Sequence, residues 1–200
     1  YDAPTKEFRG VVEVTVLDAD GNQSITEFHQ EPETKGRPKH TTFKDAQDRL
    51  YTTTDSTWYW TTPYDGAPEV KFAYLEHVDA FIYDGDDTFK QTRSRFEYDR
   101  FGNLTKVQAL GEVGVTGDER QTFHDYAYNE SAWIVNRLVH TKVTDAIEAS
   151  GVTVSERWFY YDGRLPSDPG VPSLEDAVAQ ALARWLESRG LPCELDEAAP

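Results

Sequence analysis

The stretch Tyr98-Asp99-Arg100-Phe101-Gly102-Asn103-Leu104-Thr105-Lys106-Val107 decides the fold of this 200-residue chain. Its Asp opens a tight turn, because an Asp at this place can bond the backbone of its own turn. Gly and Asn follow near the end of the turn, where they accept the positive φ that tight turns need. Alternating residues flank the turn on both sides, so the stretch predicts a β-hairpin.

The pattern recurs along the chain, which we interpret as an internal repeat of β-hairpins. The other units have their turns at Asp18–Asn22, Asp45–Arg49 and Asp145–Gly151, and a shortened copy spans Tyr161–Leu165. Aromatic residues make up 13% of the chain and lie among Thr and Val, as in β proteins. Because a single hairpin is barely stable in water, successive units must pair edge to edge. The predicted fold is mainly β, with consecutive antiparallel hairpins in a curved, extended sheet.

The last residues predict a different element. A Pro/Gly linker at 166–172 precedes Ser173, which can cap a helix with Asp176 three places on. Apolar residues then recur at helical spacing, at Leu174, Ala177, Val178, Ala181, Leu182, Trp185 and Leu186. We therefore expect a hairpin domain at 1–165, an amphipathic helix at 173–190 that docks on the sheet, and a flexible acidic tail at 191–200.

Composition excludes several classes of protein. Thirty-six acidic against 20 basic side chains give a net charge of −16, which is unsuited to binding nucleic acid. Apolar runs are only a few residues long, so no helix of the roughly 20 residues needed to span a membrane is expected. One cysteine, Cys193, allows no intrachain disulfide. The chain has no Met and begins at Tyr1, and we interpret it as an excised or processed segment.

The segment at 98–107 closely resembles the signature unit of RHS proteins, also called YD-repeat proteins. That unit begins Tyr-Asp and ends Gly-Asn or Gly-Arg before an apolar residue; Tyr161-Asp162-Gly163-Arg164-Leu165 is a shortened form. Other stretches are similar to the region that joins the β-propeller to the RHS shell in the B components of Tc insecticidal toxins. These are residues 1–4, 7–10, 28–30, 35–38, 117–120 and 132–135, so the resemblance covers about residues 1–165.

The resemblance implies a structural part of a container. In that family the repeats wind into a hollow β shell around a toxic C-terminal domain, which implies a secreted, non-catalytic module whose partners are other segments of a larger toxin-like protein. The repeat residues would set the geometry: Tyr98, Asp99, Phe101, Gly102, Asn103, Leu104, Tyr161, Asp162, Gly163 and Arg164. The chain departs from the family because its repeats stop near residue 165 and it lacks the self-cleaving core.

Acidic residues offer two kinds of candidate site, and turn chemistry explains both better. A glycosidase pair could come from Glu97 with Asp99, or from the group Asp84, Asp86 and Asp87, but adjacent turn acids do not face one another across a cleft. Calcium could bind at 18–22 or 84–87. Neither stretch has the spacing of an EF-hand loop, so we predict no metal site.

Other catalytic patterns are weak. The five His residues, His29, His40, His77, His124 and His140, occur singly, and Cys193 lies in the tail. The segment Gly111–Gly117 lacks the Lys-Ser/Thr ending of a phosphate-binding loop, so we interpret it as an irregular connection. We predict no cofactor and no enzymatic activity.

Aromatic residues at Trp58, Tyr59, Trp60 and Tyr64 support an alternative function. Exposed rings could stack on sugar faces, which would make the chain an extracellular carbohydrate- or protein-binding module. Trp58 and Trp60 share one face of a strand and Tyr59 the other, so we expect one of the two ring sets to be buried.

Overall fold

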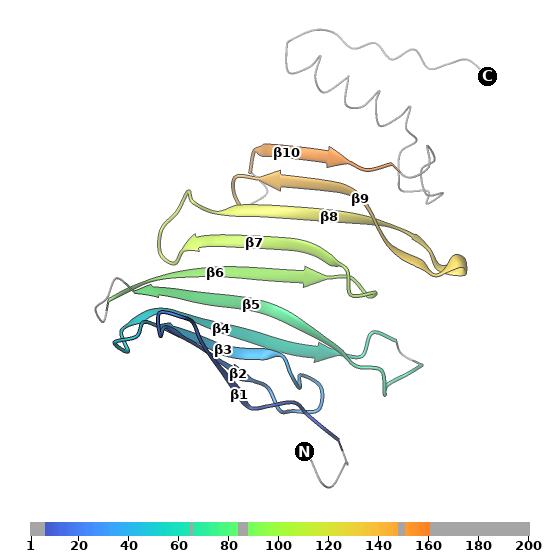
Figure 1. The fold of residues 1–200 in the computed structure, drawn as a ribbon. Coiled ribbons are helices and arrows are strands. Elements are labelled where there is room, and N and C mark those ends of the chain that lie inside the picture. Colours follow the sequence, from blue (N-terminus) through green and yellow to red (C-terminus); the bar gives the residue numbers. More distant parts are fainter. Residues whose placement is uncertain (1–6, 65, 84–87, 148–150, 161–200) are drawn as a thin grey trace, which may run out of the picture. The chain divides into compact units, whose positions relative to one another are not determined.

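A computed structural model of the chain describes residues 7–64, 66–83, 88–147 and 151–160 (Figure 1). Ten strands follow one another in sequence order, and each lies beside its chain neighbours in the sheet. Their bounds are β1 Glu13–Leu17, β2 Gln23–Phe28, β3 Pro38–Lys44, β4 Leu50–Thr61, β5 Phe72–Tyr83, β6 Phe89–Tyr98, β7 Leu104–Glu112, β8 Arg120–Asn129, β9 Ile134–Thr144 and β10 Thr153–Trp158, with a short 3-10 helix, η1, at Glu130–Ala132.

The mainly β prediction is confirmed, and the four predicted hairpins are β1–β2, β3–β4, β6–β7 and β9–β10. Strands β5 and β8 were not predicted, and β4 continues past Thr54 to Thr61. The β4–β5 connection at 62–71 contains Asp65-Gly66 but is ten residues long, so the sequence there does not show the short turn pattern of the predicted hairpins. The shortened repeat at 161–165 and the predicted helix at 173–190 lie outside the described residues.

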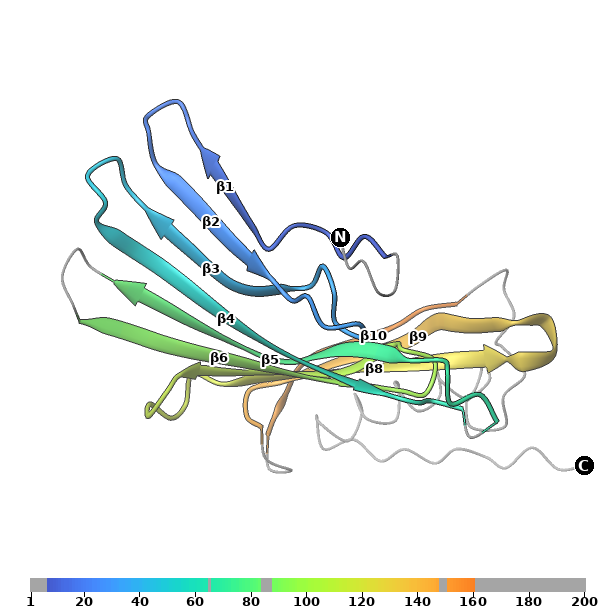
Figure 2. The ribbon, with the colours of Figure 1, turned by 90° about the horizontal axis from the view of Figure 1, so that it is seen from below.

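The chain divides into two compact units. The first unit comprises residues 1–124 and 141–156, and the second comprises residues 125–140 and 157–200. In the first unit, successive strands from β1 to β8 pair antiparallel. Figure 2 shows β1 to β6 as a single twisted layer, and such a twist follows from the steric preference of each strand.

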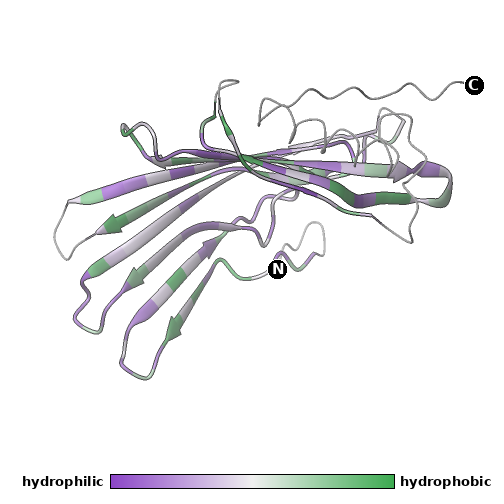
Figure 3. Cartoon of the chain, turned by 90° about the horizontal axis from the view of Figure 1, so that it is seen from above, coloured by the Kyte–Doolittle hydropathy of each residue, from purple (hydrophilic) through white to green (hydrophobic). Residues whose placement is uncertain are grey.

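Register gives the two faces of this layer different chemistry. One row across β2 to β6 carries ionisable residues, namely Glu27, His40, Asp55, Asp79 and Arg93. The adjacent row, one residue along each strand, is Thr26, Thr41, Thr54, Ala80 and Thr92. Since successive side chains point to opposite faces, these two rows lie on opposite faces of the layer, and the face with the ionisable row is here called the charged face. Figure 3 shows hydrophilic and hydrophobic residues alternating along the ribbons.

The described residues contain very little apolar core. Only Ala127 and Val139 are buried hydrophobic residues, and both belong to the second unit. Buried polar side chains outnumber them and include Asp45, Asp79 and Gln121 in the first unit. The first unit is therefore held chiefly by backbone ladders and cross-strand side-chain pairs.

Candidate functional site

The turn at Asp99 is built on the Asp carboxylate. Asp99 Oδ1 accepts hydrogen bonds from the backbone N–H groups of Phe101 and Asn103, at 2.8 and 2.9 Å. Asp99 Oδ2 accepts from the Asn103 side-chain amide at 2.8 Å. The backbone closes the hairpin from Asp99 N to the Asn103 carbonyl at 2.9 Å, with Gly102 at φ +84°.

Two further turns reproduce this arrangement, one of them with a guanidinium in place of the amide. Asp18 Oδ1 accepts from the N–H groups of Asp20 and Asn22, and Oδ2 accepts from the Asn22 amide, all within 2.8 to 2.9 Å. At the third turn, Asp45 Oδ1 accepts from the N–H groups of Gln47 and Arg49, and the Arg49 guanidinium replaces the amide at 2.6 Å. Three of the four predicted turns in the described residues thus share one hydrogen-bonded pattern, Asp-X-X-Gly/Asp-Asn/Arg, whereas Asp145 bonds Val152, seven residues on.

These bonds explain why the turn acids are structural. The amide of Asn22 is the main cause that holds the pKa of Asp18 below its usual range. At Asp45, desolvation raises the pKa, but the Arg49 backbone N–H and guanidinium outweigh it and lower the pKa. The carboxylate oxygens are committed to the turn, which favours the turn interpretation of 18–22 over a calcium loop. No group of three His, Cys, Asp or Glu side chains in the described ranges could hold a metal ion.

Aromatic rings gather beside the Asp99 turn. The Phe72 ring contacts those of Tyr74 and Tyr98, with centroids 6.1 and 5.9 Å apart, and Tyr74 lies 6.3 Å from Tyr59. A Cβ placed on Gly102 would come within 2.9 Å of the Phe72 ring, so this turn lies directly against β5. Burial raises the pKa of the Tyr98 phenol. The Tyr98 ring thus packs edge-on against Phe72 of the neighbouring strand β5.

A pocket of about 450 Å³ opens where β4 and β6 end and β5 begins. These strand ends lie on the right in Figure 1. Aromatic rings and carboxylates line it together, among them Phe72, Tyr74, Tyr98, Glu76, Glu97 and Asp99. Each of the two Glu side chains already has a basic partner: Glu76 Oε2 bonds His77 Nδ1, and Glu97 Oε1 accepts from Lys106 Nζ at 2.6 Å. Glu97 and Asp99 therefore engage different partners and do not form an opposed acid pair.

The predicted ligand-binding aromatics lie on β4 and the loop after it. Tyr59, Trp60 and Tyr64 expose 53%, 46% and 38% of their surface, and Trp58 is half-buried. The expectation that one of the two ring sets is buried is therefore wrong. Cations cover part of the indoles instead, with Lys71 Nζ 4.1 Å from the Trp60 ring centre and the Arg37 guanidinium 5.1 Å from that of Trp58.

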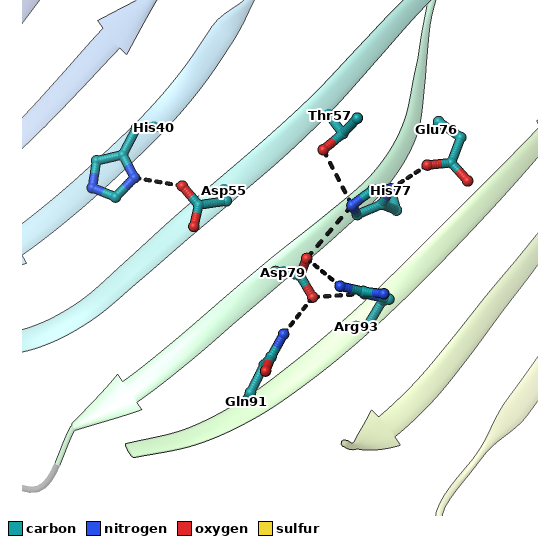
Figure 4. Close-up of polar contacts among 8 residues, drawn as sticks. All are labelled: His40, Asp55, Thr57, Glu76, His77, Asp79, Gln91 and Arg93. Atoms are coloured by element: carbon teal, nitrogen blue, oxygen red, sulfur yellow. Dashed lines mark hydrogen bonds and ion pairs between the residues drawn. The ribbon is translucent and has the colours of Figure 1, made fainter. Parts of the chain in front are cut away.

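A polar cluster that the sequence did not reveal lies on the charged face (Figure 4). Asp79 is only 7% exposed and accepts two hydrogen bonds from Arg93, at 2.7 and 2.8 Å. Gln91 donates to Asp79 at 2.8 Å, and His77 lies 3.5 Å from it. The Arg93 guanidinium is the main cause that lowers the pKa of Asp79, whereas desolvation opposes it.

Next to this cluster, Figure 4 shows His40 paired with Asp55. The Asp55 carboxylate lies 2.6 Å from His40 Nδ1, and His40 Nε2 lies 2.9 Å from the Thr42 hydroxyl. This connectivity resembles that of a carboxylate–imidazole–hydroxyl triad. Thr42, however, pairs with Ile25 on one side and Thr53 on the other, so the sheet ladder uses the backbone donors that an oxyanion hole would need. We interpret the trio as a cross-strand brace.

The second unit contains a similar brace. His140 is 8% exposed, its Nδ1 lies 2.7 Å from Asp125, and its ring stacks on Trp158 with centroids 4.0 Å apart. The sequence could have located His40 and Asp55, because a hairpin turn at 45–49 fixes the register that places them opposite each other. It gave no such signal for Asp79, since β5 was not predicted.

The structure locates some of the remaining predicted residues, and the others lie outside the residues that it describes. The repeat residues Tyr98 to Leu104 come together in one turn, whereas Tyr161, Asp162, Gly163, Arg164, Asp84, Asp86, Asp87 and Cys193 lie outside the described residues. Of the predicted irregular connection at 111–117, Gly111 and Glu112 instead belong to β7, and residues 113–119 join β7 to β8. No helix in the described part of the chain is long and apolar enough to cross a membrane.

Comparison with protein-family models finds none that matches the chain, and comparison with curated proteins finds no matching sequence.

Proposed function

We propose that the chain is a non-catalytic structural module, a segment of the shell or scaffold of a large exported bacterial RHS-repeat protein. In this role its hairpins help to enclose or present a toxic cargo, and its partners are other segments of the same large protein. The proposal combines the sequence resemblance with the observed build of the sheet.

The three equivalent Asp turns carry the proposal. They join successive strands by one hydrogen-bond pattern, which is how a repeat protein extends a structure by adding units. The near absence of buried apolar residues in the described ranges also favours a wall, because a wall segment relies on its neighbours for burial.

Cryo-electron microscopy of the complete protein encoded by the reading frame tests this role. We expect further hairpins to continue from this sheet and to surround a separate polypeptide. A reading frame that encodes no further hairpins, or a map in which this sheet encloses nothing, would overturn the proposal.

A protease assay on the complete protein provides a second test. Gly102→Val should expose the enclosed segment to digestion, since it disrupts a wall turn. Gly66→Val is the matched control, because a Cβ at Gly66 meets nothing within 4 Å and Gly66 has no left-handed φ. Equal digestion of both variants would contradict a wall role for the Asp99 turn.

Carbohydrate or protein binding through Trp58, Tyr59, Trp60 and Tyr64 is a second candidate, favoured by the exposure of Tyr59, Trp60 and Tyr64. A glycan array on the isolated chain tests the carbohydrate form. Binding that disappears in a Trp58→Ala, Trp60→Ala variant would support it, whereas an array without signal would contradict the carbohydrate form.

A further inference from the structure

We infer that the pocket at the end of β4, β5 and β6 binds an alkylammonium group on an apolar stem, the chemistry of a lysine side chain or a polyamine. This inference concerns only the pocket and does not depend on the scaffold role.

The pocket has the two kinds of group that recognise such a cation. Rings of Phe72, Tyr74 and Tyr98 provide apolar surface for the stem and a negative π face for the charge. Carboxylates of Glu76 and Glu97 provide charged acceptors on the same pocket. The volume of about 450 Å³ falls within the range of small-ligand pockets.

The charge balance favours a cation over a neutral ligand. Glu76, Glu97 and Asp99 bring three carboxylates, against two basic groups, the ammonium of Lys106 that pairs with Glu97 and the imidazole of His77 that pairs with Glu76. Asp99 uses its oxygens in the turn and contributes its field, whereas Glu76 and Glu97 each use one oxygen in the pairs described above. The net charge of −16 adds a long-range attraction for cations.

The chain also shows that its own rings take cations. Lys71 lies over Trp60, Arg37 over Trp58 and Arg100 over Phe101, at 4.1 to 5.1 Å from the ring centres. The rings of the pocket have the same chemistry with carboxylates added. We therefore expect an external ammonium to make in the pocket the same cation–π contacts that the chain's own Lys and Arg side chains make elsewhere.

Titration of the full chain followed by nuclear magnetic resonance tests the site. The probes are N-acetyl-lysine methylamide, spermidine, the uncharged isostere N-acetyl-norleucine methylamide, and glucose. We expect saturable shifts at Tyr74 and Tyr98 with the first two probes only, with a Kd in the millimolar range or about tenfold below it. Tighter binding of spermidine would identify a free polyamine as the better ligand, and tighter binding of the lysine derivative would identify a peptide side chain.

Two variants separate the site from general electrostatics. Glu76→Gln with Glu97→Gln should weaken binding about tenfold. Glu112→Gln is the control, because Glu112 also pairs with a Lys across β6 and β7, through Lys90 at 3.0 Å, and does not line the pocket. Both proteins must keep the circular dichroism spectrum of the native chain. Equal binding of the norleucine derivative or glucose, an equal loss in Glu112→Gln, or no saturation with either cation would overturn the inference.

Discussion

Gly102 shows how one residue can be fixed by two constraints at once. Its φ of +84° is costly for any residue with a Cβ, and a Cβ would also press on the Phe72 ring at 2.9 Å. We expect Gly102→Val to lower the free energy of unfolding by about 3 kcal/mol, the sum of backbone strain and overpacking. Urea denaturation measures the change.

Two other glycines separate these constraints. Gly114 has φ +92°, but a Cβ there would meet nothing within 4 Å, and Gly66 has neither constraint. Valine should therefore cost least at Gly66, more at Gly114 and most at Gly102. An equal loss of unfolding free energy at Gly102 and Gly114 would show that the Phe72 ring moves aside without an energetic penalty.

Asp79 makes the stability of the sheet fall at low pH. Because its pKa is lowered in the folded chain, the carboxylate contributes stability above its unfolded pKa of about 3.9, and this contribution is lost as the pH falls through the folded value. Asp79→Asn should cost about 1 to 3 kcal/mol at pH 7, since Arg93 loses a charged partner. It should also reduce the loss of stability below pH 4.

Chemical denaturation of both proteins between pH 2 and pH 7 checks this expectation. Asp55→Asn serves as the control, because Asp55 is on the same face but more than half of its side chain is exposed. Parallel pH profiles for native chain and Asp79→Asn would contradict the role assigned to the carboxylate.

At the scale of the element, the three Asp turns share one hydrogen-bond pattern but differ in the residues at its fourth and fifth positions. The turn at 45–49 places Asp48 at φ +64°, where the other two turns have Gly. The double change Asp48→Gly, Arg49→Asn converts it to the pattern of the Asp99 turn. We expect calorimetry to show a melting temperature about 2 °C higher, because the strain at Asp48 is relieved and the introduced amide can replace the Arg49 bond to Asp45.

The reverse exchange is the counterpart. Gly102→Asp with Asn103→Arg should lower the melting temperature, since only the Asp99 turn has Phe72 against its glycine. A melting temperature that fell with the forward exchange would mean that the turns are not equivalent in energy.

The hairpins were predictable where the turn was short and the chemistry of the turn was local. Asp18, Asp45 and Asp99 bond residues two and four places on, so their pattern is written in a few consecutive letters. Strand β5 was missed because its connection to β4 at 62–71 is ten residues long, and its Asp65 is followed three and four places on by Pro68 and Glu69, not by the Gly/Asp and Asn/Arg of the other turns. The pocket and the Asp79 cluster depend on β5, so sequence reasoning could not assemble them.

At the scale of the whole molecule, the described chain is rich in exposed apolar residues and poor in buried ones. Unfolding should therefore expose little new apolar surface. We expect a heat-capacity change of unfolding below the usual ~12–15 cal/mol/K per residue. Differential scanning calorimetry on the isolated chain measures this heat-capacity change. A value within the usual range would contradict the inference that the folded chain buries little apolar surface.

The sequence by itself determined the strand-turn-strand repeat, because each Asp turn is closed by bonds among five consecutive residues. Only the tertiary structure decided which side chains meet across strands. Register brings Asp79 to Arg93, His40 to Asp55 and Phe72 to Tyr98, which lie 14, 15 and 26 residues apart in the chain. Such pairs follow from the order and alignment of whole strands, which local propensity does not specify.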